Sequence, residues 1–289
     1  MDRARDLPDW PLAAHARSIR TRPHEWHVVE AGDGATTLLL HGAGGSTHSW
    51  AGMLPLLSQD THVVAVDLPG QGFTRAGTKT RLSLASMAQD LTALLDDQGW
   101  QPELIIGHSA GGALALQVSA LLDHPCRVVG INAALEPFEG VAGWLFPAMA
   151  KMMALNPFTS VALTMGDPMA RARGLIRSTG SDIPKDSLRC YARLFSDRGH
   201  VDATLQMMAQ WDVDLLTARL FTVQTPTLLI AGSGDPTVPP RVSKRAAQIM
   251  PNTSYVELKG LGHLAHEEAP EEVMHTIDTW TGEPVPKDG

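Results

Sequence analysis

The stretch IIGHSAGGALAL at residues 105–116 constrains the fold more than any other part of the chain. An apolar run ends at Gly107, Ser109 follows, and small residues typical of a helix begin at once. A strand that turns sharply into a helix strains the residue at the corner, and the flanking Gly107 and Gly111 let the two elements approach. The corner exposes the serine hydroxyl beside the first amides of the helix. The pattern predicts a nucleophile at Ser109; the alternative is an ordinary serine in a strand-to-helix turn.

Apolar, β-branched runs recur along the chain and alternate with helix-like stretches. The runs lie at 27–31, 36–42, 62–70, 103–109, 127–133, 227–235 and 254–260, and the helix-like stretches at 83–97, 110–122, 240–249 and 269–280. Continuous apolar strands alternating with helices are typical of a mostly parallel sheet covered on both faces. The predicted fold class is α/β.

One long interval contains no strand-like run. Residues 135–218 are rich in helix formers and methionine, and 289 residues suffice for one large domain that carries an insertion. We predict a core built from residues 1–134 and 219–289, with residues 135–218 forming a helical cap, or lid.

A serine hydroxyl needs a base to remove its proton and a carboxylate to orient that base. Asp235 follows the strand-like run TLLIA, and His263 follows the run SYVEL. The ends of neighbouring parallel strands meet at one edge of the sheet, so we expect Ser109, Asp235 and His263 to form a catalytic triad. Two alternatives stay open, because Asp235 could cap the helix that begins near 239, and His266 competes with His263 for the role of base.

Acyl transfer also needs two backbone N–H groups to hold the oxyanion. The amide of Ala110, directly after the nucleophile, is one candidate, and Ala43 in HGAGGSTHSW (41–50) is the other. The glycines of this loop could also suit a phosphate, but no Lys-Ser/Thr pair follows them, which argues against a nucleotide site.

Five motifs in this order resemble the α/β-hydrolase superfamily across roughly residues 20–281. They are HGAGG (41–45), DLPGQGFT (67–74), GHSAGG (107–112), GSGDPTVP (232–239) and GLGHLAHEE (260–268). The resemblance implies an eight-stranded sheet, a lid inserted after the sixth strand, and the chain order Ser, Asp, His. Gly44 stands where many relatives have proline, which leaves the donor in this loop open.

Four segments near or within the predicted cap support a narrower resemblance. They are INAALEPFEG (131–140), LFPAMAKMMALNPF (145–158), IRSTGS (176–181) and YARLFSDRGHVDATLQMMAQWD (191–212). They are similar to the family of bacteriochlorophyll-biosynthesis hydrolases described as magnesium-chelatase accessory proteins. The resemblance implies a photosynthetic bacterium, a tetrapyrrole pathway and chelatase subunits as partners, and it does not fix a reaction.

The composition of the cap suits an amphipathic anion. Seven of the 12 methionines lie there, and residues 151–200 hold eight Lys or Arg against four Asp. Methionine adapts to irregular apolar partners, and arginine pairs with carboxylates. A porphyrin or anionic lipid headgroups would fit; packing filler and a solvated helix face are the alternatives.

Further residues are candidates for substrate contact, although core or structural roles are equally open for them. His200 could meet the magnesium of a macrocycle, and the two tryptophans could line a pocket. The candidates are His41, Gly42, Trp50, His108, Met152, Met153, His200 and Trp211.

Charge, cysteines and apolar segments exclude several classes of protein. A net charge of −8 argues against nucleic-acid binding. The two cysteines, Cys126 and Cys190, form no disulfide or zinc pattern. The histidines have no metal-ligand spacing, so we expect no metal, and ester hydrolysis needs no cofactor. The chain shows neither an export signal nor a membrane span. We predict a cytoplasmic serine hydrolase that cleaves an ester or related acyl bond, with peripheral membrane contact left open; the alternative is a non-catalytic porphyrin-binding accessory factor.

Overall fold

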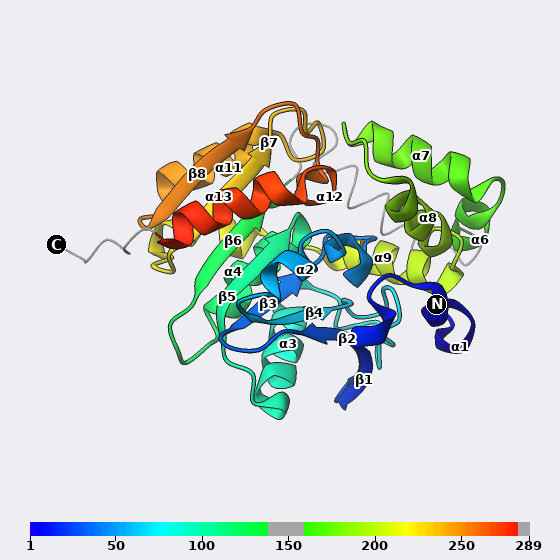
Figure 1. Cartoon of the computed structure of the whole chain (residues 1–289). Coiled ribbons are helices and arrows are strands. Elements are labelled where there is room, and N and C mark those ends of the chain that lie inside the picture. Colours follow the sequence, from blue (N-terminus) through cyan, green and yellow to red (C-terminus); the bar gives the residue numbers. More distant parts are fainter. Residues whose placement is uncertain (138–158, 283–289) are drawn as a thin grey trace.

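The computed structural model describes residues 1–137 and 159–282, and an eight-stranded sheet forms its centre (Figure 1). The strand order is β1-β2-β4-β3-β5-β6-β7-β8. β2 is antiparallel to β1 and β4, and the strands from β4 to β8 run parallel. The strands are β1 (Ala16–Thr21), β2 (His24–Ala31), β3 (Thr36–Leu40), β4 (His62–Val66), β5 (Pro102–His108), β6 (Arg127–Ile131), β7 (Thr227–Gly232) and β8 (Thr253–Leu258).

Each of the seven predicted apolar runs coincides with one strand, β2 to β8. The edge strand β1 was not predicted from the pattern of the sequence. Its sequence, ARSIRT, buries Ile19 and leaves the neighbouring Ser18 and Arg20 exposed. An edge strand with a single buried side chain has no apolar run to reveal it.

Helices cover both faces of the sheet because successive strand side chains point to opposite sides. Leu38 and Leu40 of β3 belong to the core beneath α3, α4 and α11, whereas Leu39 belongs to the core beneath η3, α2 and α13. These helices are η3 (Thr47–Trp50), α2 (Leu54–Leu57), α3 (Leu84–Gln98), α4 (Ala110–Ser119), α11 (Pro240–Ile249) and α13 (Pro270–Gly282).

The described residues between β6 and β7 contain helices and no strand. We call residues 159–218 the cap; in Figure 1 its helices α6 to α9 lie together at one end of the molecule. The elements are α6 (Thr159–Thr164), α7 (Pro168–Ser178), α8 (Lys185–Leu194), α9 (Arg198–Gln210) and α10 (Asp214–Thr217), followed by η4 (Leu220–Thr222).

The N-terminal segment packs against the cap, which the sequence did not predict. It contains α1 (Arg3–Asp6), η1 (Leu7–Asp9) and η2 (Ala13–His15). Trp10 is buried in a third apolar cluster with Ile176 and Leu188 of the cap. Arg193 of α8 lies over the Trp10 ring and donates to Asp6 at 2.9 Å. This segment therefore joins the cap to the core.

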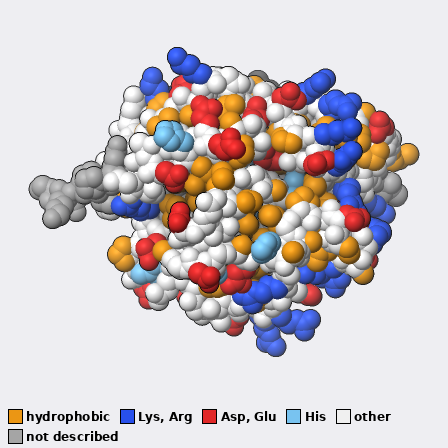
Figure 2. Space-filling view, viewed as in Figure 1, with side chains coloured by type: hydrophobic (Ala, Val, Ile, Leu, Met, Phe, Trp, Pro, Cys, Tyr) orange, Lys and Arg blue, Asp and Glu red, His pale blue; other side chains and the backbone are white. Residues whose placement is uncertain are grey.

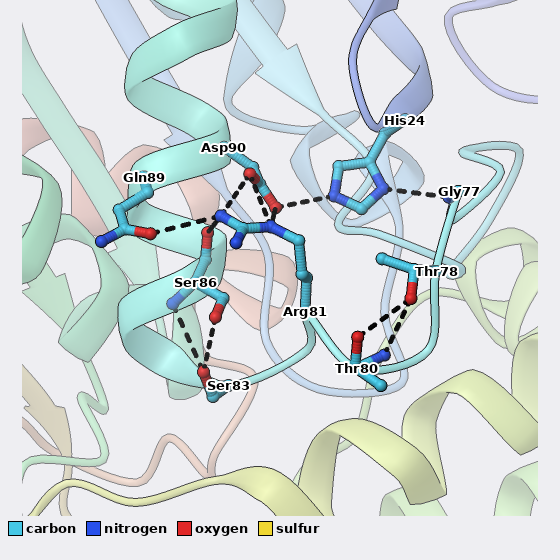
Figure 3. A network of polar contacts seen from close by, with 9 residues as sticks. All are labelled: His24, Gly77, Thr78, Thr80, Arg81, Ser83, Ser86, Gln89 and Asp90. Atoms are coloured by element: carbon cyan, nitrogen blue, oxygen red, sulfur yellow. Dashed lines mark hydrogen bonds and ion pairs between the residues drawn. The ribbon is translucent and has the colours of Figure 1, made fainter.

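A polar network fixes the start of β2 to α3 (Figure 3). Arg81 donates three hydrogen bonds to the Asp90 carboxylate, and the ring of His24 bonds Asp90 at 2.9 Å. Nδ1 of His24 accepts from the Gly77 N–H, so its Nε2–H is the donor to Asp90. Burial lowers the pKa of His24 despite this carboxylate. The network holds a neutral imidazole in the core.

Within residues 1–137 and 159–282, no helix has the length and apolar character required to cross a membrane.

The approach of β3 to α4 yields a stability prediction. A Cβ on Gly111 would lie 2.1 Å from the carbonyl oxygen of Leu40, whereas a Cβ on Gly174 would meet nothing within 4 Å. We expect Gly111→Ala to lower the free energy of unfolding by at least about 2 kcal/mol, because backbone cannot move aside. Gly174→Ala, in the middle of α7, should raise it by about 0.5–1 kcal/mol. Urea unfolding of both variants measures the difference, and equal stabilities would contradict it.

Candidate active site

Ser109 stands at the sharp turn between β5 and α4. Its backbone has φ 52° and ψ −116°, a conformation that a residue with a side chain rarely adopts. A Cβ on Gly107 would lie 2.1 Å from the carbonyl oxygen of Gly111. The Ser109 N–H donates to Ile131 O at 2.9 Å. The glycines therefore permit the close strand-to-helix contact that strains Ser109 and leaves it half-buried.

His263 and Asp235 are hydrogen-bonded at the same edge of the sheet. His263 Nδ1 lies 2.7 Å from Asp235 Oδ2, and both residues are buried. Asp235 Oδ1 accepts from the N–H groups of Thr237 and Val238, so the carboxylate also braces the turn before α11. Asp235 does not cap this helix, because its N-cap residue is Pro239, with no side-chain cap hydrogen bond. Because Nδ1–H donates to Asp235, the lone pair of His263 is on Nε2.

Asn132 is a further member of the site that sequence reasoning missed. It follows β6 with φ 48°, and its Nδ2 donates to Asp235 Oδ2 at 2.8 Å. Both oxygens of Asp235 therefore have two hydrogen-bond donors each. The signal available in the sequence was an asparagine directly after an apolar strand, a residue type that tolerates positive φ.

The loop of His263 contacts the residue before Ser109. His108 Nε2 donates to the His263 carbonyl oxygen at 2.8 Å, and the two ring centroids lie 4.8 Å apart. In the described part of the chain no hydrogen bond joins Ser109 Oγ to His263. Hydrogen bonds between a nucleophile and its base are often long in structures that hold no substrate. The structure thus pairs His263 with Asp235 and brings their loop against the Ser109 turn.

His266, the competing base, lies in a different environment. It is fully buried, and neither ring nitrogen has a hydrogen-bond partner among the described residues. Its ring packs on Trp50 and His108, with centroid distances of 4.7 and 4.4 Å. Burial lowers the pKa of His266 to about 3. His266 therefore lacks the carboxylate partner that His263 has.

The loop after β3 presents one unused N–H group beside Ser109. The Gly45 N–H donates to Gly42 O at 3.0 Å, and the Gly44 N–H donates to Gln71 Oε1 at 2.7 Å. In the described chain no hydrogen bond uses the N–H groups of Ala43 or Ala110. A Cβ on Gly42 would lie 3.0 Å from the Ser109 Cβ, so this loop touches the nucleophile candidate. Gln71, which sequence reasoning also missed, accepts from the Gly44 N–H and leaves the N–H of Ala43 free.

Two histidines predicted to contact substrate, His41 and His200, have both ring nitrogens hydrogen-bonded to backbone groups. His41 donates from Nδ1 to Gly42 O and accepts at Nε2 from the Leu68 N–H. His200 accepts at Nδ1 from the Gly72 N–H and donates from Nε2 to Gly44 O. Burial lowers the pKa of His200 to about 4, so its ring is neutral and holds the cap against the loop of Gly44.

The other predicted contact residues differ in their positions. Trp50 is fully buried, and Trp211 is partly buried against the core. Met152 and Met153 lie outside the described residues. Among the described residues no three His, Cys, Asp or Glu side chains gather as metal ligands would.

A mostly apolar cavity of about 340 Å³ lies in the cap beside the loop of Gly44. A Cβ on Gly44 would lie 3.7 Å from atoms of Phe195 and Thr204, which line this cavity. The remaining lining residues are Leu163, Arg171, Leu175, His200, Val201 and Leu205. Figure 2 shows Lys and Arg side chains gathered over the same end of the molecule. The cap thus offers apolar surface near the site and basic side chains outside it.

Glu267 is a fully buried carboxyl group between core and cap. It belongs to α12 (Ala265–Glu268), and its Oε1 accepts from the hydroxyl of Tyr191 on α8 at 2.7 Å. Its Oε2 has no partner among the described residues. Burial raises the pKa of Glu267 to about 8.

Comparisons with known proteins agree on the family. The model of the alpha/beta hydrolase fold matches residues 37–270. The magnesium-chelatase 30 kDa subunit of Rhodobacter capsulatus is 43% identical over 281 residues, covering 96% of this chain and 98% of the relative. RutD of Pseudomonas syringae pv. syringae, provisionally assigned as a carbamate hydrolase, is 30% identical over 244 residues, covering 84% and 92%.

Solved structures agree on the fold. An alpha/beta hydrolase fold protein from Burkholderia ambifaria has a TM-score of 0.76 at 20% identity, covering 91% of this chain and 97% of the other. A thermophilic esterase from Thermogutta terrifontis has a TM-score of 0.73 at 21% identity, covering 92% and 97%. Identities this low bear on the fold alone. The predicted fold class and the resemblance read from the motifs are confirmed.

The buried Glu267 predicts how stability depends on pH. Its pKa rises from 4.5 to about 8 on folding, so between these values the folded protein keeps a proton that the unfolded chain releases, and stability falls as pH rises. Glu267→Gln retains an acceptor for Tyr191 and cannot ionise. We expect its melting temperature to exceed that of the wild type by a margin that grows from pH 5 to pH 8. Exposed Glu271→Gln is the control, and parallel melting profiles for Glu267→Gln and wild type would contradict the expectation.

Proposed function

Because the chain belongs to the alpha/beta hydrolase fold family, we propose that it is a serine hydrolase that cleaves an ester or a related acyl bond. The observation that carries the proposal is the 2.7 Å contact of His263 with Asp235, in a loop that packs against the strained turn of Ser109. The hydrolase assignment of RutD, 30% identical, agrees with this chemistry.

The proposed reaction uses groups already described. His263 Nε2 removes the proton of Ser109 as the Oγ attacks the acyl carbon, and Asp235 stabilises the imidazolium that forms. The N–H groups of Ala43 and Ala110 hold the oxyanion, and each such donor contributes about 3–4 kcal/mol to transition-state stabilisation. His263 then protonates the leaving group. A water molecule, deprotonated by His263, releases the acid from Ser109.

The proposed triad is tested by matched serine variants. We expect Ser109→Ala to abolish labelling by a fluorophosphonate and hydrolysis of p-nitrophenyl esters. Ser119→Ala, a buried serine at the other end of α4, should leave both unchanged. Asp235→Asn should lower kcat by about 10⁴-fold, since it disturbs the tautomer of His263. Labelling at a serine other than 109, or none in the wild type, would overturn the assignment.

For the substrate we propose a tetrapyrrole ester of bacteriochlorophyll biosynthesis, at or near the magnesium-chelatase step. The 43% identical relative from Rhodobacter capsulatus is named as a magnesium-chelatase subunit. The cavity beside Gly44 supplies apolar walls and the cation of Arg171. Arg173 and Arg177 lie exposed on the opposite side of α7, where they can pair with propionate groups that extend out of the cavity.

The name of that relative also favours a second function, a non-catalytic accessory factor of magnesium chelatase. The two functions differ in one result. This chain and its Ser109→Ala variant are each expressed in a Rhodobacter capsulatus strain that lacks its own 30 kDa subunit, and pigment synthesis is measured. If the protein acts as an enzyme, only the wild type restores pigment synthesis. If it acts as an accessory factor, both restore it equally.

Tetrapyrrole binding is tested by quenching of tryptophan fluorescence with protoporphyrin IX and its magnesium derivative. We expect the double variant Arg173→Ala/Arg177→Ala to weaken binding about three- to tenfold, the effect of two exposed ion pairs. Arg171 is left in place because it donates to the carbonyl of Phe195 and to Ser196 in the cap. Arg17→Ala/Arg20→Ala on β1 removes the same charge at the far edge of the sheet and should have no effect. Equal affinities for both double variants would contradict the proposed role of α7.

A further inference from the structure

The connection between α7 and α8 contacts both loops that carry the proposed acid–base pair. In Figure 1 one end of α7 reaches toward the loops after β7 and β8. We call residues 179–182 the cap turn. It belongs to the cap, whereas Asp235 and His263 belong to the core. Contacts between the cap turn and these loops therefore cross from one part of the molecule to the other.

The cap turn accepts hydrogen bonds from two successive amides at the proposed base. The His263 N–H donates to Thr179 O at 3.1 Å. The Leu264 N–H donates to Ser181 Oγ at 2.8 Å. Ser181 and Leu264 are 3% and 5% exposed, so water does not replace this acceptor readily. The peptide that bears the imidazole is thus held by the cap on both sides.

Glu268 ties the same two segments together a second time. Its Oε1 accepts from the Gly262 N–H at 2.9 Å, and its Oε2 accepts from the Asp182 N–H at 3.3 Å. The residue before His263 and the last residue of the cap turn therefore share one carboxylate. Both bonds are charge-assisted, which makes them stronger than neutral ones.

Backbone packing leaves the loops little freedom. A Cβ on Gly262 would lie 2.4 Å from the carbonyl oxygen of Gly180, and a Cβ on Gly180 would lie 2.3 Å from the carbonyl oxygen of Gly234. Gly180 has φ +76°, which favours glycine. Gly180 is therefore packed between the loop of His263 and the loop of Asp235. A shift of the cap turn would move both.

We propose that the cap turn positions His263 against Asp235, and that Ser181 is the side chain on which this positioning depends. The inference rests on the proposed function for its effect on rate. Without Ser181 Oγ, the buried Leu264 N–H loses its acceptor, which costs the fold free energy and loosens the loop. His263 then departs from the geometry set by its contact with Asp235. Ser181 is a positioning residue and takes no part in the chemical step.

The experiment compares three serine variants in the full chain with a p-nitrophenyl ester as probe. We expect Ser181→Ala to lower kcat about 10- to 100-fold, the effect of a displaced catalytic group, with KM changed less than twofold. Ser181→Thr retains the hydroxyl and should restore most of kcat. Ser178→Ala removes a hydroxyl three residues earlier that donates to Leu175 O within α7, and it should behave as wild type.

A spectroscopic signal separates positioning from a general loss of stability. The His263 Nδ1–H bonded to Asp235 should give a proton resonance far downfield, assigned by its absence in His263→Gln. We expect Ser181→Ala to weaken or shift this resonance at temperatures where the variant is fully folded. An unchanged resonance together with kcat equal to that of Ser178→Ala overturns the proposal. If Ser181→Ala does not fold, the same two measurements are made on Glu268→Gln, which loses one of the two carboxylate acceptors.

Failure of the proposed function gives a different result. If the wild type hydrolyses no ester and Ser109 resists fluorophosphonate, the hydrolase proposal fails. The downfield resonance still reports the geometry of His263 and Asp235 in that case. Its loss in Ser181→Ala, with recovery in Ser181→Thr, supports the positioning role, and its persistence in both variants overturns it.

Discussion

The hydrogen bond between His263 and Asp235 depends on loops from four strands and on the cap. Asp235 follows β7 and is braced by Asn132, which follows β6. The carbonyl of His263 accepts from His108 at the end of β5. No one of these loops can hold the pair alone, because each supplies one or two contacts. The 2.7 Å distance therefore reports the packing of the whole edge of the sheet.

Burial around this edge keeps several histidines neutral. The pKa of His266 falls to about 3 and that of His200 to about 4, both chiefly through desolvation. A buried group that cannot take up a proton acts as a hydrogen-bond donor and acceptor of fixed tautomer. His200 shows the consequence, since it links Gly72 and Gly44 across the cap contact. By contrast, His263 Nδ1 has the carboxylate of Asp235 as its hydrogen-bond partner.

Features that depend on local sequence patterns could be predicted from the sequence, whereas features that depend on contacts between distant residues could not. Strands β2 to β8 were predicted because they are continuous apolar runs, and the turn at Ser109 was predicted because Gly107 and Gly111 flank it. β1 has one buried side chain and was missed. The docking of Trp10 on the cap and the contact of Ser181 with Leu264 depend on residues about 80 or more positions apart. No periodic pattern in either segment predicts such a contact.

The cap contributes both to the lining of the apolar cavity and to the hydrogen bonds that hold the loop of His263. Residues of α7 and α9 line the apolar cavity beside Gly44, and the connection that follows α7 accepts hydrogen bonds from the loop of His263. A change in α7 that reshapes the cavity is transmitted through a short, glycine-packed turn to the proposed base. No side chain separates Gly180 from the loop of Asp235, so a rotation of α7 that shifts Gly180 bears directly on that loop. Substitutions in α7 chosen for a new substrate should therefore alter kcat together with KM.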